Sequence, residues 1–210
     1  MTGLPSRIYP VVDRADWVAT LGQAGAKLIQ LRLKDMPVEA LLGEIRKGRE
    51  LARAHGVCLV LNDYWRIAID EGIDFIHLGQ EDLDEADLPA IRRAGLRLGV
   101  STHSHEELHR GLEVRPDYVA LGPVWPTKLK KMPWGAQGVE RLTEWKRLIG
   151  DLPLVAIGGI TLARAPSCLA AGADCVSAVS DFIRMPDPQA QVRAWLQATR
   201  TREDMGKASA

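Results

Sequence analysis

Two carboxylates follow two neighbouring apolar runs in the first half of the chain. Asp63 comes directly after the run CLVLN, and Asp82 closes the polar cluster GQED that follows the run FIHL. If both runs are strands of one parallel sheet, their carboxyl ends meet at the same edge and bring the two side chains together. Carboxylate oxygens suit Mg²⁺, which leaves coordination positions for substrate phosphates. We therefore expect Asp63 and Asp82 to hold Mg²⁺; the alternative is that both acids cap the helices that follow.

A row of polar side chains occupies alternate positions of an earlier run, QLRLKD. Because side chains of a strand alternate between its two faces, Gln30, Arg32 and Lys34 share one face. Leu31 and Leu33 must pack under helices on the other face, which turns the amide, guanidinium and ammonium groups toward the site. Arginine offers a fork and lysine a point charge, so this row predicts an anion site. The alternative is a strand edge whose long side chains reach solvent.

Polar residues also follow the run LGV. Ser101 could donate a hydrogen bond to a bound phosphate or to a substrate amine. Ser104 with Glu107 three residues later is typical of a capping box at a helix start. His103 could carry a proton, although a histidine beside a helix start more often has a structural role.

The segment PVWPTKLKKMPWGAQG, residues 123–138, is the longest connection between predicted elements. It carries three lysines and two tryptophans. A long connection without structure of its own is typical of an active-site lid or a disordered insert. Basic and aromatic residues fit a lid over an anionic, aromatic substrate; single-stranded nucleic acid is the alternative ligand.

Short strands alternate with amphipathic helices throughout the chain. This pattern predicts a single (β/α)₈ TIM barrel over residues 1–200, followed by a polar tail at 201–210. A doubly wound open sheet is the competing fold, and the count of eight strands argues against it. The helix N-caps are expected at Asp16, Ser104 and Thr161. The strands are expected at 7–12, 27–32, 57–62, 75–78, 97–101, 118–122, 154–157 and 174–179, and the helices at 16–25, 37–55, 65–71, 86–94, 104–114, 139–149, 161–171 and 188–200.

In a barrel, the loops after the seventh and eighth strands often bind phosphate. Here Gly158 and Gly159 follow the seventh run, where backbone N–H groups at a helix start could approach a ligand. Ser180 follows the eighth run. Together with the basic row, this predicts two anion sites, and hence two phosphorylated substrates or one substrate with two phosphates.

Composition excludes several other classes. Of 210 residues, 46% are hydrophobic, which is enough for a full core, and 27 basic residues balance 27 acidic ones. A net charge of zero argues against a general nucleic-acid binder. The three cysteines lack metal-type spacing, and Cys58 and Cys175 in apolar runs are expected to be buried, reduced thiols. No apolar run approaches the ~20 residues of a membrane span, and we expect a cytoplasmic protein without a signal peptide.

Seven short motifs occur in an order that resembles thiamine phosphate synthase across residues 8–196. They are QLRLKD at Gln30, LND followed by IAIDEG, HLGQED at His77, LGVSTH at Leu98, DYVALGPVWPT at Asp117, AIGGIT at Ala156 and AVS before Asp181. The resemblance implies a TIM barrel that joins an aminopyrimidine methyl diphosphate to a thiazole phosphate and releases pyrophosphate. It also implies that Mg²⁺ is required and that pyrophosphate leaves before the thiazole nitrogen attacks the resulting carbocation.

The resemblance also assigns roles to residues. It places Asp63 and Asp82 on Mg²⁺, with Arg32, Lys34 and Lys130 stabilising the leaving pyrophosphate. The expected contacts of the pyrimidine diphosphate are Gln30, Arg32, Lys34, Asn62, Ser101 and Lys130, and those of the thiazole phosphate are Thr127, Gly159, Val179 and Ser180.

One departure from the family pattern lies in the lid. The family usually has Thr-x-Thr-Lys, whereas this chain has Leu129 between Lys128 and Lys130, so one hydroxyl is missing. Lys128 or Lys131 could compensate for it. Two other functions remain open: a thiazole tautomerase-like isomerase that uses His103, and a non-catalytic barrel that binds thiamine phosphate. Apolar helix faces would also allow two barrels to pair as a homodimer.

Overall fold

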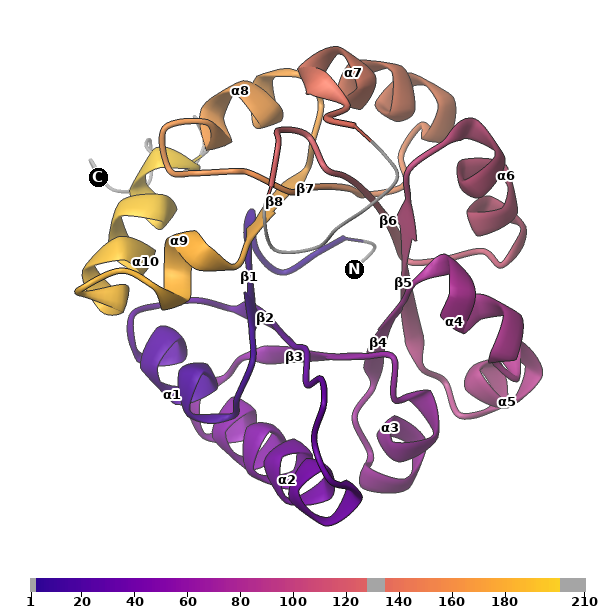
Figure 1. Cartoon of the computed structure of the whole chain (residues 1–210), viewed down its shortest axis with the longest axis vertical. Helices are drawn as coiled ribbons and strands as arrows, with labels where there is room; N and C mark the ends of the chain where they lie inside the picture. The colour runs from indigo at the N-terminus through magenta and orange to yellow at the C-terminus, as the bar shows by residue number, and fades with distance from the viewer. Residues whose placement is uncertain (1–2, 128–134, 201–210) are drawn as a thin grey trace.

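A closed barrel of parallel strands forms the centre of the protein. The computed structural model describes residues 3–127 and 135–200, and in them strands β1 to β8 pair in sequence order, with β8 closing on β1. Figure 1 looks down the barrel and shows the helices as a ring around it. The predicted (β/α)₈ fold is thus confirmed. The strands are β1 Ile8–Val12, β2 Leu28–Leu31, β3 Cys58–Asn62, β4 Phe75–Leu78, β5 Arg97–Thr102, β6 Tyr118–Leu121, β7 Leu154–Ile157 and β8 Cys175–Ala178.

Ten helices connect or follow these strands in the described residues. They are α1 Asp16–Gln23, α2 Val38–His55, α3 Trp65–Glu71, α4 Gln80–Glu85, α5 Leu88–Arg93, α6 His105–Glu113, α7 Gly138–Ile149, α8 Ala165–Ala170, α9 Ser180–Ile183 and α10 Pro188–Ala198. Most boundaries agree with the predicted ranges within one or two residues, and β4, β7 and α3 agree completely. Gly56 and Gly72 end α2 and α3 with φ of 60° and 64°, which glycine adopts without steric cost.

Some predicted helices and caps were wrong. The predicted helix 86–94 is preceded by the separate helix α4, and α9 was not predicted at all. Both have six residues or fewer, too short for apolar periodicity to reveal them. Thr161 is not an N-cap, because residues up to Arg164 form a turn and α8 begins only at Ala165. Asp16 is the first residue of α1 rather than its cap, and it pairs with Lys47 at 2.8 Å.

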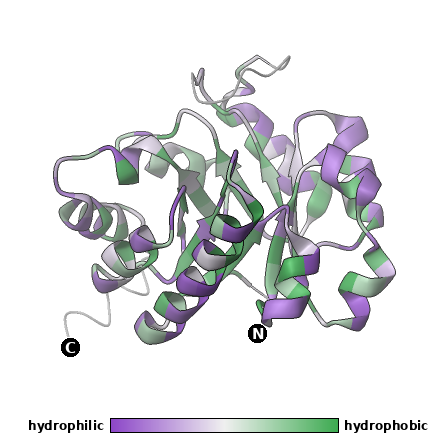
Figure 2. Cartoon of the chain, turned by 60° about the horizontal axis from the view of Figure 1, so that its bottom comes forward, coloured by the Kyte–Doolittle hydropathy of each residue, from purple (hydrophilic) through white to green (hydrophobic). Residues whose placement is uncertain are grey.

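The barrel strands are buried on both faces. Their outward side chains pack against the helices in a large cluster, and Figure 2 shows the hydrophobic strands inside a layer of helices with hydrophilic outer faces. This double burial explains why the strands are apolar throughout rather than alternating. A smaller cluster fills the barrel interior: Tyr9, Leu28, Val60, Phe75, Tyr118, Ala120, Val155 and Cys175.

Tyr118 takes up so much of this interior that a neighbouring strand must leave room for it. Gly99 on β5 faces the barrel axis, and a Cβ there would overlap the Tyr118 ring. The ring also lies edge-on to Phe75, with centroids 5.7 Å apart. Glycine at position 99 is therefore a packing requirement of Tyr118.

The cysteines differ in burial. Cys175 is buried as expected, whereas Cys58 is only half-buried and accepts a hydrogen bond from Arg97 at 3.2 Å. No helix in the described residues is long and apolar enough to cross a bilayer. The pairing of two barrels stays a prediction.

Candidate active site

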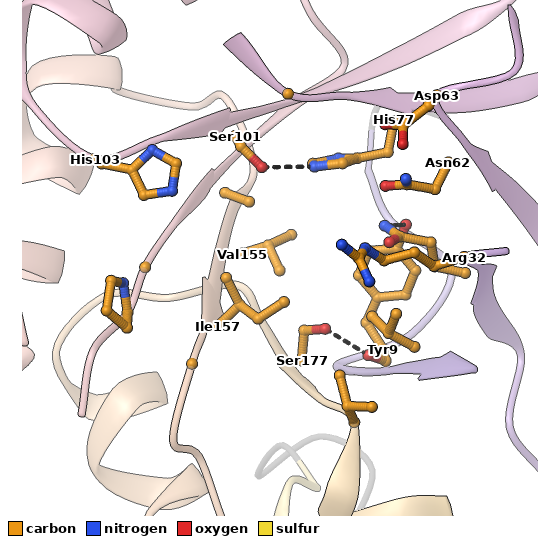
Figure 3. A pocket seen from close by; sticks show the side chains of 18 of the residues that line it. Tyr9, Arg32, Asn62, Asp63, His77, Ser101, His103, Val155, Ile157 and Ser177 are labelled. Atoms are coloured by element: carbon orange, nitrogen blue, oxygen red, sulfur yellow. Dashed lines mark hydrogen bonds between the residues drawn. The ribbon is translucent and has the colours of Figure 1, made fainter. Parts of the chain in front are cut away.

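A cavity of about 380 Å³ opens where the barrel strands end and the βα loops begin. Figure 3 shows polar side chains entering it from several strands, with the apolar Val155 and Ile157 on another side. Most residues predicted to form the site therefore lie around one space. Those that line it are Gln30, Arg32, Lys34, Asn62, Asp63, Asp82, Ser101, Thr127 and Val179.

The two aspartates lie next to each other in this cavity. Asp63 directly follows β3 and donates its backbone N–H to the carbonyl of His77 on β4 at 2.9 Å, which holds the two strand ends together. Burial and then the nearby Asp63 carboxylate raise the pKa of Asp82 above its usual value. A carboxyl group whose pKa is raised by a neighbouring carboxylate marks a place where a cation would be stabilised.

Asp82 also has the capping role that was considered as an alternative. Its Oδ2 accepts the backbone N–H of Gly79 at 3.1 Å, at the start of α4. Within residues 3–127 and 135–200, in contrast, the Asp63 side chain caps no helix. Its φ of 67° lies in the left-handed region, which costs aspartate less than most residues.

The basic row reaches the same space from β2. Leu31 and Leu33 are buried in the outer cluster, and the alternate side chains Gln30, Arg32 and Lys34 line the cavity. Lys34 forms an ion pair with Asp63, so one cation already lies against the carboxylate pair. Because Lys34 is about half exposed, this surface pair contributes little to stability and is free to exchange partners with a ligand.

A buried group of hydrogen-bonded side chains lies under the cavity, and sequence reasoning did not select it. His77 Nε2 is 2.8 Å from Ser101 Oγ, and His77 Nδ1 is 2.7 Å from the Tyr118 hydroxyl. The Tyr118 hydroxyl lies 3.0 Å from that of Tyr9, which accepts a hydrogen bond from Gln30 Nε2 at 3.0 Å. Burial lowers the pKa of His77 to about 4, so its imidazole is neutral at pH 7. The alternation in FIHL, which puts His77 on the same face as Phe75, was the signal that could have revealed it.

A second cavity of about 600 Å³ lies beside the first, between the loops after β6, β7 and β8. Gly159 and Ser180 line this second space, while Thr127, Gly158 and Val179 line both. Those predicted residues of the two anion sites that the structure describes thus lie in adjoining cavities.

The two glycines after β7 are needed for a reason that was not predicted. Gly158 and Gly159 have φ of 94° and 66°, and a Cβ on either would strike residues 123–126 at 2.5–2.8 Å. They let the loop after β6 pack closely over the end of β7. Because α8 begins only at Ala165, their N–H groups do not form a helix start, contrary to our expectation.

Asp181 ties the loop after β7 to the helices that follow β8. Its Oδ2 accepts hydrogen bonds from the Leu162 backbone N–H at 3.0 Å, from Gln191 at 2.7 Å and from the indole of Trp195 at 2.8 Å. One carboxylate therefore joins the loop after β7 to α9 and α10 beside the second cavity.

The remaining predicted residues lie at the edge of the site or outside the described chain. His103 lines the first cavity, and its Nδ1 lies 2.7 Å from Glu107. Ser104 caps α6 as predicted, but Glu107 bonds the backbone N–H of His103 instead of closing a capping box. Lys130, with Lys128, Leu129 and Lys131, lies outside the described residues.

Known proteins resemble this chain over most of its length. A family model described as thiamine monophosphate synthase matches residues 8–182. A protein of Rhizobium etli named thiamine-phosphate synthase is 60% identical over 191 residues, covering 91% of this chain and 94% of that protein. One from Escherichia coli K12 with the same name is 46% identical over 182 residues, covering 87% and 86%.

Solved structures agree in fold. Thiamine phosphate pyrophosphorylase from Pyrococcus furiosus superimposes with a TM-score of 0.81 at 24% identity, covering 91% of this chain and 94% of that one. A structure titled "Native KDPGal structure" superimposes with a TM-score of 0.73 at 15% identity, covering 97% and 98%. Both likenesses, at less than 25% identity, concern the fold alone. On the family match and the two sequence relatives, the chain belongs to the thiamine monophosphate synthase family of enzymes.

Proposed function

We propose that this enzyme couples 4-amino-2-methyl-5-(diphosphooxymethyl)pyrimidine with a thiazole phosphate, giving thiamine phosphate and pyrophosphate with the help of Mg²⁺. One observation carries the proposal: a cavity with paired carboxylates and inward cations adjoins a second cavity walled by the loops after β6, β7 and β8. The first space suits a diphosphate with its metal, and the second suits a monophosphate.

The donor set of the first cavity fits Mg²⁺. Asp63 and Asp82 would hold the ion, which would neutralise negative charge on the diphosphate. In the parts of the chain that the structure describes, no three His, Cys, Asp or Glu side chains surround one point. Phosphate oxygens and water would therefore complete the coordination, as is usual for Mg²⁺ at phosphate sites.

The cations of β2 are placed to stabilise the leaving group. Arg32 would bind diphosphate oxygens through its fork, and Lys34 would move from Asp63 to the same anion. The family resemblance adds Lys130 to this set. Charge that collects on the departing pyrophosphate is then balanced before the new bond forms, which favours a dissociative reaction.

The rest of the first cavity would hold the pyrimidine. Gln30, Asn62 and Ser101 offer hydrogen bonds to its ring, and Val155, Ile157 and Ala120 supply apolar contacts. An apolar wall that excludes water protects a carbocation from hydrolysis. The thiazole nitrogen then attacks the cation and needs no protein base.

The thiazole phosphate would lie in the second cavity. Gly159 and Ser180 line that space, and Thr127 and Val179 stand at its boundary with the first. Arg164 and Arg184 also line it and add positive charge for a phosphate. The ring nitrogen would thereby face the pyrimidine methylene from the adjoining cavity.

A product assay tests the proposal and separates it from the two other functions. With both substrates and Mg²⁺, we expect thiamine phosphate and pyrophosphate in equal amounts, and neither product when Mg²⁺ is chelated. An isomerase acting through His103 would convert a single thiazole phosphate without releasing pyrophosphate, and a binding protein would show no turnover. Either of those results would refute the synthase.

A further inference from the structure

Five side chains form a continuous hydrogen-bonded path from one side of the first cavity to the other, under its floor. We call it the buried polar chain; in order, its members are Gln30, Tyr9, Tyr118, His77 and Ser101. Gln30 and Ser101 line the cavity, and so do Tyr9 and His77, which are only 1% and 7% exposed; Tyr118 is fully buried beneath them. A hydroxyl or imidazole inside such a path cannot turn to water, so the direction of each hydrogen bond depends on its neighbours.

The placement of Gln30 determines the direction of the first bond. Its Nε2 donates to the Tyr9 hydroxyl, so the single proton of Tyr9 must go elsewhere. In the described residues its only other hydrogen-bond partner is the Tyr118 hydroxyl. Tyr9 therefore donates to Tyr118.

The direction of this bond also determines the directions of the bonds toward Ser101. Tyr118 already accepts from Tyr9, and its own proton goes to Nδ1 of His77, which must then carry a lone pair. The neutral ring has its proton on Nε2 and donates it to Ser101 Oγ. Ser101 accepts inside the protein and directs its own proton into the cavity. At the opposite end, Gln30 uses its nitrogen on Tyr9 and leaves its carbonyl oxygen for a ligand.

We propose that the buried polar chain gives the site a fixed polarity, with Ser101 as donor and Gln30 as acceptor, which selects a ring that carries both an unprotonated nitrogen and an amine. Tyr9, Tyr118 and His77 are the positioning residues that hold this polarity and need not touch the substrate. The inference deepens the proposed function and rests on it for the identity of the ligand. A 4-aminopyrimidine offers ring nitrogens to Ser101 and amine protons to Gln30. A 4-oxo ring would bring an oxygen instead of those protons and would leave a polar pair unmatched.

The opposite polarity requires the Gln30 amide to be turned around. Its oxygen would then accept from Tyr9, every later bond would reverse, and His77 would carry its proton on Nδ1. Ser101 would donate to His77 and would present only lone pairs to a ligand. The two directions therefore differ in one observable, the tautomer of His77.

Nitrogen-15 NMR of the free, histidine-labelled enzyme measures that tautomer directly, without any substrate. We expect the His77 signals of a neutral ring protonated at Nε2; protonation at Nδ1 would overturn the proposal. Tyr118→Phe removes the donor to His77 Nδ1. The Nδ1 lone pair then has no hydrogen bond, and we expect its nitrogen-15 resonance to shift. Ser101→Ala removes only the terminal acceptor and should keep it, which makes it the matched control.

A second variant tests the origin of the direction. Gln30→Glu has the same shape, but an ionised carboxylate only accepts hydrogen bonds, so Tyr9 would donate to it. We expect this change at the far end of the chain to move the His77 proton from Nε2 to Nδ1. An unchanged tautomer in folded Gln30→Glu protein would show that the path does not transmit polarity.

Discrimination between substrates gives the functional readout. The ratio of kcat/KM for the 4-amino pyrimidine diphosphate over its 4-oxo counterpart is expected to fall about 10- to 100-fold in Tyr118→Phe, the usual cost of an unmatched buried polar group. A loss of folded enzyme would lower both kcat/KM values equally and leave their ratio unchanged, and an unchanged KM for the thiazole phosphate would exclude a general distortion of the site. An unchanged ratio would refute the selective role. If wild-type enzyme made no thiamine phosphate while His77 showed the expected tautomer, the proposed function would fail and the polarity of the chain would stand.

Discussion

Asp181 binds three donors with one oxygen, and its removal has a cost that can be worked out from the structure. The Trp195 indole is fully buried, so its N–H would lose its partner without gaining water, at about 1–3 kcal/mol. The Leu162 backbone and Gln191 are half-buried and recover part of their hydrogen bonding from solvent, at about 1 kcal/mol each. Asp181→Ala should therefore reduce the free energy of unfolding by roughly 3–5 kcal/mol.

Thermal unfolding gives the first measurement. For a chain of this size the loss corresponds to a fall in Tm of about 6–20 °C. Asp187→Ala is a matched control, because Asp187 caps α10 by accepting a single backbone N–H from Ala190 at 2.8 Å. Losing that cap should cost only about 1 kcal/mol. Equal Tm values for the two variants would refute the reasoning.

Kinetics give the second measurement for the same variant, at a temperature where it is folded. Asp181 positions the loop after β7 through Leu162. Beyond Gly158, which lines both cavities, this loop lines only the second one. We expect the KM for the thiazole phosphate to rise and the KM for the pyrimidine diphosphate to stay the same. A rise in both would contradict the separate assignment of the two cavities.

Two further predictions follow from the loop packing and from the aspartate pair. Gly159→Ala would place a Cβ 2.8 Å from Trp125 and Pro126 and displace that segment, which would admit water to the site. Hydrolysis of the pyrimidine diphosphate to its alcohol should then increase at the expense of thiamine phosphate. An unchanged ratio of alcohol to thiamine phosphate would contradict the role of this segment in excluding water. Because burial and Asp63 raise the pKa of Asp82, the folded state without Mg²⁺ holds that proton more tightly than the unfolded state does. Stability in EDTA should therefore fall as the pH rises from the unfolded pKa of aspartate through the raised value. Asp82→Asn should remove this slope from thermal melts, and an equal slope in both proteins would show that Asp82 is not its source.

The barrel and the residues at its strand ends could be predicted because both depend on short-range patterns. Alternation in QLRLKD was sufficient to put Arg32 and Lys34 in the cavity, and the parallel sheet brought Asp63 next to Asp82. Both predictions depend only on the local sequence and on the parallel direction of the strands, not on contacts between side chains across the barrel.

The parts that could not be predicted depend on contacts between distant segments. Tyr9 and Tyr118 are 109 residues apart and meet only because the barrel closes, so neither the buried polar chain nor the need for Gly99 is visible in a local pattern. Likewise, Gly158 and Gly159 looked like ligand contacts, whereas packing against residues 123–126 requires them. The short helix α9 places Asp181 under the loop after β7, and four residues carry no periodic signal.

Calorimetric titration of the pyrimidine diphosphate tests most directly whether Asp63, Asp82 and the basic row share one metal-bound diphosphate. With Mg²⁺ present, we expect tight binding to the wild type and a loss of about 100-fold or more in Asp63→Asn, as when a buried charged partner is removed. In EDTA, wild type and variant should bind equally weakly. Equal affinities of the two proteins in Mg²⁺, or wild-type affinity that does not change with the metal, would contradict the account.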